Sequence, residues 1–259
     1  MSKTALITGA SSGIGYELAK CFARGGTNLV LVARNETRLA QIASELQNAF
    51  GISVRVIQAD LSRALAPSEI HDATRARNIE IDYLVNNAGF GFGGSFVESD
   101  LQADLQMLQV NMVSLVHLTR LYLPGMYKRA AGGVLNVAST AAFQPGPLMA
   151  LYYATKAFVL SFTEALAEES RDTGVTATAL CPGPTATDFQ RRAKIESVRL
   201  MKFKLGMMTA AEVAEIGYSA FLEGKAVVIP GLLNKFGAQS VRFSPRALVR
   251  RITRKLQET

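Results

Sequence analysis

Short apolar runs alternate with longer amphipathic segments along most of the chain. The apolar runs cover residues 4–8, 28–33, 53–58, 83–86, 133–138, 176–180 and 226–229. The longer segments at 15–24, 36–50, 101–127 and 152–173 carry polar residues at helical intervals. Most of the apolar runs have no polar face, which is typical of parallel strands covered by helices on both sides. The pattern predicts an α/β protein built on a single-domain, Rossmann-like, doubly wound parallel sheet of about seven strands.

Two segments fall outside this alternation. Residues 185–208 follow the sixth predicted strand and mix basic with apolar side chains, so we expect a substrate lid there. Residues 231–259 form a basic tail that is partly helical, with a helix start at Ser244-Pro245. No repeat and no flexible linker marks a further domain, so residues 1–230, lid included, are predicted to form one folded domain.

The composition is that of an ordinary globular protein, with 49% hydrophobic and 19% charged residues. The net charge of +7 is concentrated in the tail. There Glu258 is the one acidic residue beside the basic residues Lys235, Arg242, Arg246, Arg250, Arg251, Arg254 and Lys255. In the predicted tail helix, Leu248, Val249, Ile252 and Leu256 share one side. Docking on the body or on a second subunit is the favoured interpretation, ahead of adhesion to an anionic membrane. Nucleic-acid contact is the least expected.

The chain contains no apolar run long enough to span a bilayer and no leader-like segment before its first strand. We therefore expect a cytoplasmic protein, with peripheral membrane contact through the tail kept as an alternative. Cys21 and Cys181 are expected to be reduced and buried. Because neither has a neighbour at metal-ligand spacing, no metal site is expected.

The first strand ends in a glycine-rich turn, Thr8-Gly9-Ala10-Ser11-Ser12-Gly13-Ile14-Gly15, directly before a helix. Free N–H groups at a helix N-terminus and the lack of side chains on glycine favour the binding of a pyrophosphate. A purely structural turn is the alternative. At the end of the second strand stands Arg34 rather than an acidic residue. A guanidinium pairs with a ribose 2′-phosphate, so NADP(H) is predicted in preference to NAD(H), unless Arg34 is only a solvated surface residue.

Three landmarks in this order resemble those of the short-chain dehydrogenases/reductases: TGASSGIG at residues 8–15, Asp60-Leu61, and Asn86-Asn87-Ala88-Gly89. The resemblance implies that Asp60 hydrogen-bonds the adenine amino group and that residues 86–89 support the sheet beside the cofactor. It makes residues 1–230 a dinucleotide-binding catalytic domain and implies a homodimer or homotetramer.

Tyr152 and Lys156 lie one helical turn apart, close enough for the ammonium to favour the tyrosinate. Such a pair supplies the acid/base that hydride transfer to a carbonyl requires. Tyr153 points elsewhere around the helix, so Tyr152 is the predicted acid/base. Ser139, at the end of the fifth strand, is predicted to hydrogen-bond the substrate oxygen, and Thr140 is the competing hydroxyl.

The resemblance also assigns roles to Asn111 and to residues 181–187. Asn111 matches the family's helix asparagine, which orders a water on a proton path past the lysine. Cys181-Pro182-Gly183-Pro184-Thr185-Ala186-Thr187 matches the segment that holds the nicotinamide amide, with Thr187 as the side-chain contact. The predicted catalytic residues are Asn111, Ser139, Tyr152 and Lys156. The predicted cofactor contacts are Gly9, Ser11, Ser12, Gly13, Ile14, Gly15, Arg34, Asp60, Leu61, Asn87, Ala88, Gly89, Tyr152, Lys156, Pro182, Gly183, Thr185 and Thr187.

These features predict an NADP(H)-dependent oxidoreductase that interconverts a carbonyl and a secondary alcohol. Apolar side chains expected over the nicotinamide suggest a lipophilic ketone or ketoacyl substrate. They are Phe90, Phe92, Phe96, Phe143, Leu148, Met149, Phe189 and Met201. The basic lid residues Arg191, Arg192 and Lys194 could recognise an acidic handle, although solvated surface is the favoured interpretation. The alternative function is a non-catalytic NADP(H)-binding sensor or scaffold that acts through the tail.

Overall fold

A seven-stranded, all-parallel sheet forms the centre of the computed structural model, which describes residues 2–193, 195–199 and 206–258. The strand order is β3-β2-β1-β4-β5-β6-β9. The strands are β1 (Thr4–Thr8), β2 (Asn28–Ala33), β3 (Val54–Gln58), β4 (Tyr83–Asn86), β5 (Gly132–Val137), β6 (Val175–Leu180) and β9 (Val227–Val228). Strand order reverses between β1 and β4, the kind of point at which doubly wound sheets bind ligands beyond the carboxyl ends of their strands.

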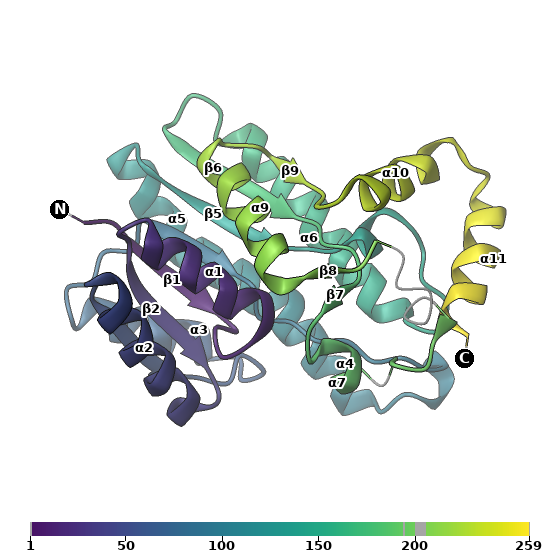
Figure 1. The fold of residues 1–259 in the computed structure, drawn as a ribbon, viewed down its shortest axis with the longest axis horizontal. Helices are drawn as coiled ribbons and strands as arrows, with labels where there is room; N and C mark the ends of the chain where they lie inside the picture. The colour runs from purple at the N-terminus through teal and green to yellow at the C-terminus, as the bar shows by residue number, and fades with distance from the viewer. Residues whose placement is uncertain (1, 194, 200–205, 259) are drawn as a thin grey trace.

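Helices cover both faces of the sheet (Figure 1). One core cluster joins the sheet to α1 (Gly13–Arg24), α2 (Glu36–Phe50) and α9 (Ala210–Leu222). Two others lie against α3 (Ala66–Arg75), α5 (Ser114–Arg129) and α6 (Ala150–Glu169). Because both faces are buried, the strands lack a polar face, and the predicted fold class is confirmed.

The predicted elements agree with the structure except in details. Four expected strands differ at their ends, and the helices expected at 15–24 and 152–173 are α1 and α6. The long helix expected at 101–127 is wrong as a single element. It consists of α4 (Leu101–Leu108), a π-helical turn at Gln109–Val113 and α5. Asn111 lies in this turn with its side chain buried. It hydrogen-bonds to Phe90 and Thr155 at the point where the α-helical pattern is interrupted.

Several unpredicted elements surround the carboxyl ends of the strands. The short strands β7 (Thr185–Ala186) and β8 (Met208–Thr209) pair in parallel, with Thr185 opposite Met208. The short helix α7 (Phe189–Arg192) follows β7, and α10 (Leu232–Ser240) precedes α11 (Arg246–Gln257), the tail helix that was predicted to begin at Ser244-Pro245. Figure 1 shows α10 and α11 together at one end of the molecule, away from the N-terminus. No helix in the described part of the chain is both long enough and apolar enough to span a membrane.

Candidate active site

A single cleft of about 1560 Å³ runs along the carboxyl edge of the sheet. Its lining extends from the turn after β1 and Arg34, past Tyr152, to side chains of α10 and α11. Every residue predicted to be catalytic or to contact the cofactor lines it, with the exception of Gly15 and Asn111. Segments far apart in the sequence therefore contribute to one continuous site.

The turn after β1 is held against residues 87–88 by backbone-directed hydrogen bonds. Asn87 donates through Nδ2 to the carbonyl oxygens of Thr8 at 2.9 Å and Gly9 at 3.2 Å. The Thr8 hydroxyl oxygen accepts from the backbone amides of Asn87 and Ala88, each at 3.0 Å. Gly9 has φ of 65°, and a Cβ there would lie 2.8 Å from Nδ2 of Asn87. Gly15 is buried behind this turn and does not line the cleft, and a Cβ on it would clash with Nδ2 of Asn87 and the carbonyl of Gly9.

The same turn faces the segment around β7 across the cleft. Gly13 has φ of 57°, and a Cβ on it would lie 3.2 Å from Cγ2 of Thr187. α1 begins at Gly13, so its N-terminus opens toward the cleft. A narrow cradle that excludes side chains, placed at a helix N-terminus, fits the pyrophosphate of a dinucleotide.

At the far end of this half of the cleft, Arg34 is exposed at the rim and Asp60 is partly buried. Burial acts to raise the pKa of Asp60. The Ser62 amide, 3.0 Å from Oδ1, and the charges of Arg34 and Arg63 outweigh burial and lower it. Arg38 lies with its guanidinium carbon 5.6 Å from the ring centroid of Tyr16. Of the two arginines, Arg34 is thus the one beside the Asp60 carboxylate.

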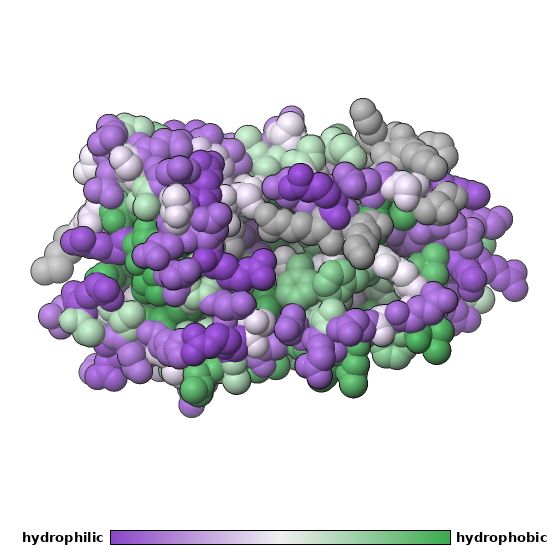
Figure 2. Space-filling view, turned by 90° about the horizontal axis from the view of Figure 1, so that it is seen from below, coloured by the Kyte–Doolittle hydropathy of each residue, from purple (hydrophilic) through white to green (hydrophobic). Residues whose placement is uncertain are grey.

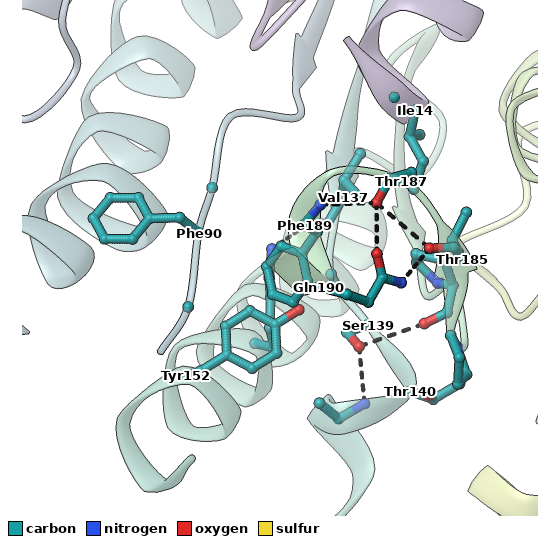
Figure 3. Close-up of a pocket in the computed structure, with 18 of the residues that line it drawn as sticks. Ile14, Phe90, Val137, Ser139, Thr140, Tyr152, Thr185, Thr187, Phe189 and Gln190 are labelled. Carbon is teal, nitrogen blue, oxygen red and sulfur yellow. Dashed lines mark hydrogen bonds between the residues drawn. The ribbon is translucent and has the colours of Figure 1, made fainter. Parts of the chain in front are cut away.

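Tyr152, on the first turns of α6, directs its hydroxyl toward Ser139 (Figure 3). Burial raises the pKa of Tyr152, and the hydrogen-bonding Ser139 hydroxyl partly offsets this. The Ser139 oxygen also accepts from the Ala141 amide at 3.1 Å, which fixes its position. Thr140 lies on the far side of Ser139 from Tyr152 in the same view, so Ser139 is the hydroxyl next to the phenol.

Tyr153 faces a different environment from its neighbour. Its ring is buried, and its hydroxyl oxygen accepts a hydrogen bond from Nε2 of Gln257 at 2.7 Å. Gln257 belongs to α11. The two adjacent tyrosines therefore have different partners: Tyr152 lies beside Ser139, and Tyr153 bonds to Gln257.

Lys156 is 6% exposed and donates through Nζ to the carbonyl oxygen of Val137 at 2.7 Å. Burial lowers the pKa of Lys156 to about 8. Its Nζ lies 5.8 Å from the ring centroid of Tyr152. Burial raises the pKa of Tyr152 overall, so this shift does not isolate the effect of Lys156, and the support of the tyrosinate by Lys156 stays a prediction.

Asn111 does not line the cleft but braces it from behind. Its Oδ1 accepts from the amide of Phe90 at 3.1 Å, while Nδ2 donates to the carbonyl of Phe90 at 2.9 Å and to Oγ1 of Thr155 at 3.1 Å. These bonds link the π-helical turn to the loop after β4 and to α6. The side chain of Asn111 thus fixes the position of the loop and helix that frame Lys156.

The cleft has an apolar half beyond Tyr152. Phe90, Phe92, Met149 and Phe189 line it as predicted, and the rings of Phe189 and Tyr152 lie 5.3 Å apart. Viewed from below (Figure 2), the surface is hollowed near its middle, with hydrophobic side chains in the hollow and hydrophilic ones around it.

Three residues expected in this apolar half do not line the cleft, and a fourth, Met201, lies outside the described residues. Phe96 is 67% exposed on an outer turn, and Phe143 packs against the core cluster under α6. Leu148 has φ of 67° in the loop before α6 and offers its carbonyl to the amide of Gly94.

The family model for short chain dehydrogenases matches residues 3–197. The chain belongs to the short-chain dehydrogenase family. The match ends before β8, α9, β9, α10 and α11 of this short-chain dehydrogenase.

Known proteins resemble this short-chain dehydrogenase over most of its length. It is 36% identical over 196 residues to a very-long-chain 3-oxoacyl-CoA reductase of Anas platyrhynchos, covering 73% of this chain and 62% of that protein. A short-chain dehydrogenase from Sphingobium yanoikuyae, solved in complex with NADPH, superposes with a TM-score of 0.83 at 32% identity, covering 93% of each chain. The bulky-bulky ketone specific alcohol dehydrogenase from Comamonas testosteroni has a TM-score of 0.77 at 31% identity, covering 94% of this chain and 95% of that one.

Among the cleft residues of this short-chain dehydrogenase that were missed in the sequence are Gln190, Asn234 and Gln257. Gln190 donates to the Thr185 carbonyl, and its Oε1 lies 3.5 Å from the Thr187 hydroxyl, so it braces that segment. Asn234 on α10 donates to the carbonyls of Gly206 at 2.9 Å and Pro230 at 3.0 Å. Gln257 forms part of the wall near Tyr153. A signal existed only for Gln257, since Val249, Thr253 and Gln257 recur at the four-residue spacing of one helix face.

The basic residues predicted in the lid are only partly described. Arg191 is exposed and pairs with Asp188 at 3.0 Å. Lys194 and the side chain of Arg192 lie outside the described residues. The ion pair to Asp188 favours solvated surface over an acidic-substrate site at Arg191.

Proposed function

We propose that this short-chain dehydrogenase reduces lipophilic ketones with NADPH. The observation that carries the proposal is the position of the Tyr152 phenol beside Ser139 and one helical turn from Lys156. All three line the same cleft as the glycine turn. That arrangement combines a proton donor, a second hydroxyl and a cation at one point.

The nucleotide half of the cleft fits a dinucleotide, since glycines at positions 9 and 13 leave room that side chains would fill. The turn after β1 would hold the pyrophosphate, Asp60 the adenine, and Arg34 a 2′-phosphate. Lys156 has ammonium hydrogens beyond the one given to Val137 and would hold the nicotinamide ribose. When bound, the nicotinamide supplies the hydride.

The residues of the chain manage the proton and the oxygen. Because burial raises the pKa of Tyr152, its phenol stays protonated at neutral pH and can donate to a carbonyl oxygen as charge develops there. Ser139 would donate a second hydrogen bond to the same oxygen and hold it in place. Lys156, with Nζ 5.8 Å from the ring centroid of Tyr152, would stabilise the tyrosinate left behind through its charge. Oxidation of an alcohol is the reverse of these steps.

The substrate class follows from the apolar half of the cleft. Phe90, Met149 and Phe189 offer little to a small polar ketone and favour a large apolar one. The similarity to a long-chain oxoacyl-CoA reductase and to a bulky ketone dehydrogenase supports the same class. We therefore infer a ketone flanked by bulky or long apolar groups.

The test is cofactor consumption by the purified chain. With NADPH and a panel of aromatic, steroid and 3-oxoacyl ketones, absorbance at the nicotinamide band should fall for at least one class. Tyr152→Phe should lower kcat by at least about 100-fold with NADPH affinity kept, because it removes the acid but not the binding site. Tyr153→Phe is the matched control and should retain most of kcat.

Equal losses in the two variants would contradict the assignment of Tyr152. Tight NADPH binding without turnover on any ketone or alcohol, in either direction, would favour the alternative of a non-catalytic sensor.

A further inference from the structure

The two tail helices and the turn between them expose large apolar side chains. Leu232 and Phe236 on α10 are 87% and 76% exposed, and Phe243 in the turn between the helices is 89% exposed. Leu248 and Ile252 on α11 are each 50% exposed. We call these five residues and the basic residues among them the tail surface. Such grouped exposure is unusual on a protein surface that meets only water.

Basic residues are interspersed along the chain with these apolar side chains. Exposed basic side chains occur throughout the same segment: Lys235, Arg242, Arg246, Arg250, Arg251, Arg254 and Lys255. Arg254 pairs with Glu258 at 3.3 Å. Apart from that pair, no ion pair is described for this segment within residues 231–258. The tail surface therefore combines apolar anchors with a strongly basic border.

The body of the protein fixes the orientation of α11. Val249, Thr253 and Gln257 are buried, and Gln257 bonds to Tyr153. The buried side shares Val249 with the apolar stripe expected in the sequence but is rotated from Leu248 and Ile252, which remain half-exposed. α11 therefore packs on the body of the protein through one side and exposes Leu248 and Ile252 on another.

The tail surface borders the cleft. Leu233 on α10 and Ile252 and Leu256 on α11 line the cleft, while Leu232 and Leu248 beside them face outward. The apolar half of the cleft and the exposed apolar side chains are thus neighbours on the same two helices.

We propose that the tail surface docks the protein on an anionic phospholipid bilayer, with the mouth of the cleft at the lipid. Apolar side chains that enter the interface, surrounded by arginine and lysine, are the combination that binds anionic lipid. A two-fold pairing through this surface would bring its basic residues together, so a second copy is the less suitable occupant. Nucleic acid would use the charges but would leave the aliphatic side chains without a partner.

A second exposed apolar patch provides a matched control. Phe96, Val97 and Leu101 are 67%, 89% and 67% exposed at the start of α4. Their neighbours Glu98 and Asp100 are acidic, so this patch should not bind an anionic membrane. This patch therefore exposes apolar side chains to a similar extent as the tail surface, but its neighbouring charges are negative.

The experiment is flotation of the full chain with vesicles of phosphatidylcholine alone and of phosphatidylcholine with phosphatidylglycerol. We expect binding to the mixed vesicles that falls as salt is raised, and little binding to phosphatidylcholine alone. Leu232→Gln/Phe236→Gln/Phe243→Gln should lower the bound fraction at least about tenfold, because each anchor contributes apolar burial. Val97→Gln/Leu101→Gln should bind like the unchanged chain. Circular dichroism and NADPH binding would show that both variants fold.

Equal flotation of the two variants, or no flotation of the unchanged chain, would overturn the proposal. The proposal would also be overturned if the Leu232→Gln/Phe236→Gln/Phe243→Gln variant had a lower molecular mass in solution than the unchanged chain but the same vesicle binding. That result would assign the surface to a second copy. Because binding is measured without turnover, the result does not depend on the proposed reaction.

Discussion

Gln257 donates a hydrogen bond of 2.7 Å to the hydroxyl of Tyr153, across 104 residues of sequence. The bond is buried and joins α11 to the residue beside Tyr152. Oε1 of Gln257 has no hydrogen-bond partner within the described part of the chain. The end of the tail helix is therefore part of the wall of the cleft.

This bond makes a prediction about stability and substrate affinity. Gln257→Ala should lower the free energy of unfolding by about 1–3 kcal/mol, because the buried Tyr153 hydroxyl loses one of its two hydrogen-bonding side chains and keeps only Gln144. It should also raise KM for a bulky ketone more than it changes kcat, since α11 lines the cleft without touching Tyr152. Gln47→Ala, at an exposed position of α2, is the control. Thermal unfolding and steady-state kinetics provide both readings, and an unchanged melting temperature would contradict the contact.

Gly91 lies against the ring of Tyr152, and a Cβ on it would be 2.7 Å from Cδ2 of that ring. Gly91→Ala should therefore displace the phenol. We expect kcat to fall about 10- to 100-fold while the dissociation constant for NADPH stays nearly the same, because a misplacement of about 1 Å is enough to disturb catalysis. Gly125→Ala, within α5, should leave kcat unchanged. If Gly91→Ala also lost much of its NADPH affinity, the added methyl group would be disturbing the cofactor site rather than the Tyr152 ring alone.

Arg34 should decide between the two nicotinamide cofactors. Arg34→Ala should weaken NADPH binding by about tenfold or more, the effect of losing charge-assisted hydrogen bonds to a phosphate, and leave NADH binding nearly unchanged. Arg38→Ala should have a smaller effect, because that guanidinium packs over Tyr16. Equal weakening of both cofactors by Arg34→Ala would rule out recognition of the 2′-phosphate.

Lys156 should make stability depend on pH in alkaline solution. Its pKa is about 8 in the folded protein and 10.5 as the ordinary value, so between these pH values the unfolded chain binds the additional proton. Stability therefore rises with pH across this interval, by at most about 1.4 kcal/mol per pH unit, and is independent of this group below it. The unfolding free energy of the unchanged chain minus that of Lys156→Met should therefore become more positive from pH 8 to 10.5.

Urea denaturation at a series of pH values measures this difference, and Lys128→Met controls for loss of an exposed ammonium on α5. A difference that falls as pH rises would mean that Lys156 is stabilised as a cation in the folded protein. Lys156→Met should also lose activity. Loss of activity without loss of stability near pH 8 would show that Lys156 serves catalysis while its buried charge destabilises the fold.

Much of the fold was predictable because its strands are buried on both faces. Continuous apolar runs such as Asn28–Ala33 have no other stable placement, and β2 begins and ends at those residues. The π-helical turn at Gln109–Val113 was not predictable, because it depends on the contacts of Asn111 with Phe90 and Thr155, which are distant in sequence.

The candidate site was predictable where a motif and a strand end coincide, as at Gly9 and Ser139. The electrostatics were not. Spacing places Lys156 near Tyr152, but only the packed structure shows that burial dominates the pKa of the phenol. Likewise, α11 is visible in the sequence as an amphipathic helix, whereas the side on which it docks depends on Tyr153.

The pairing of β7 with β8 ties together the two ends of residues 187–207, with Thr185 opposite Met208. A loop whose ends are joined in this way can change in length or composition at little cost to the elements that flank it. New sequences between these two strands could therefore be exchanged between homologues as a cassette, altering cleft residues such as Phe189 while β6 and α9 keep their places.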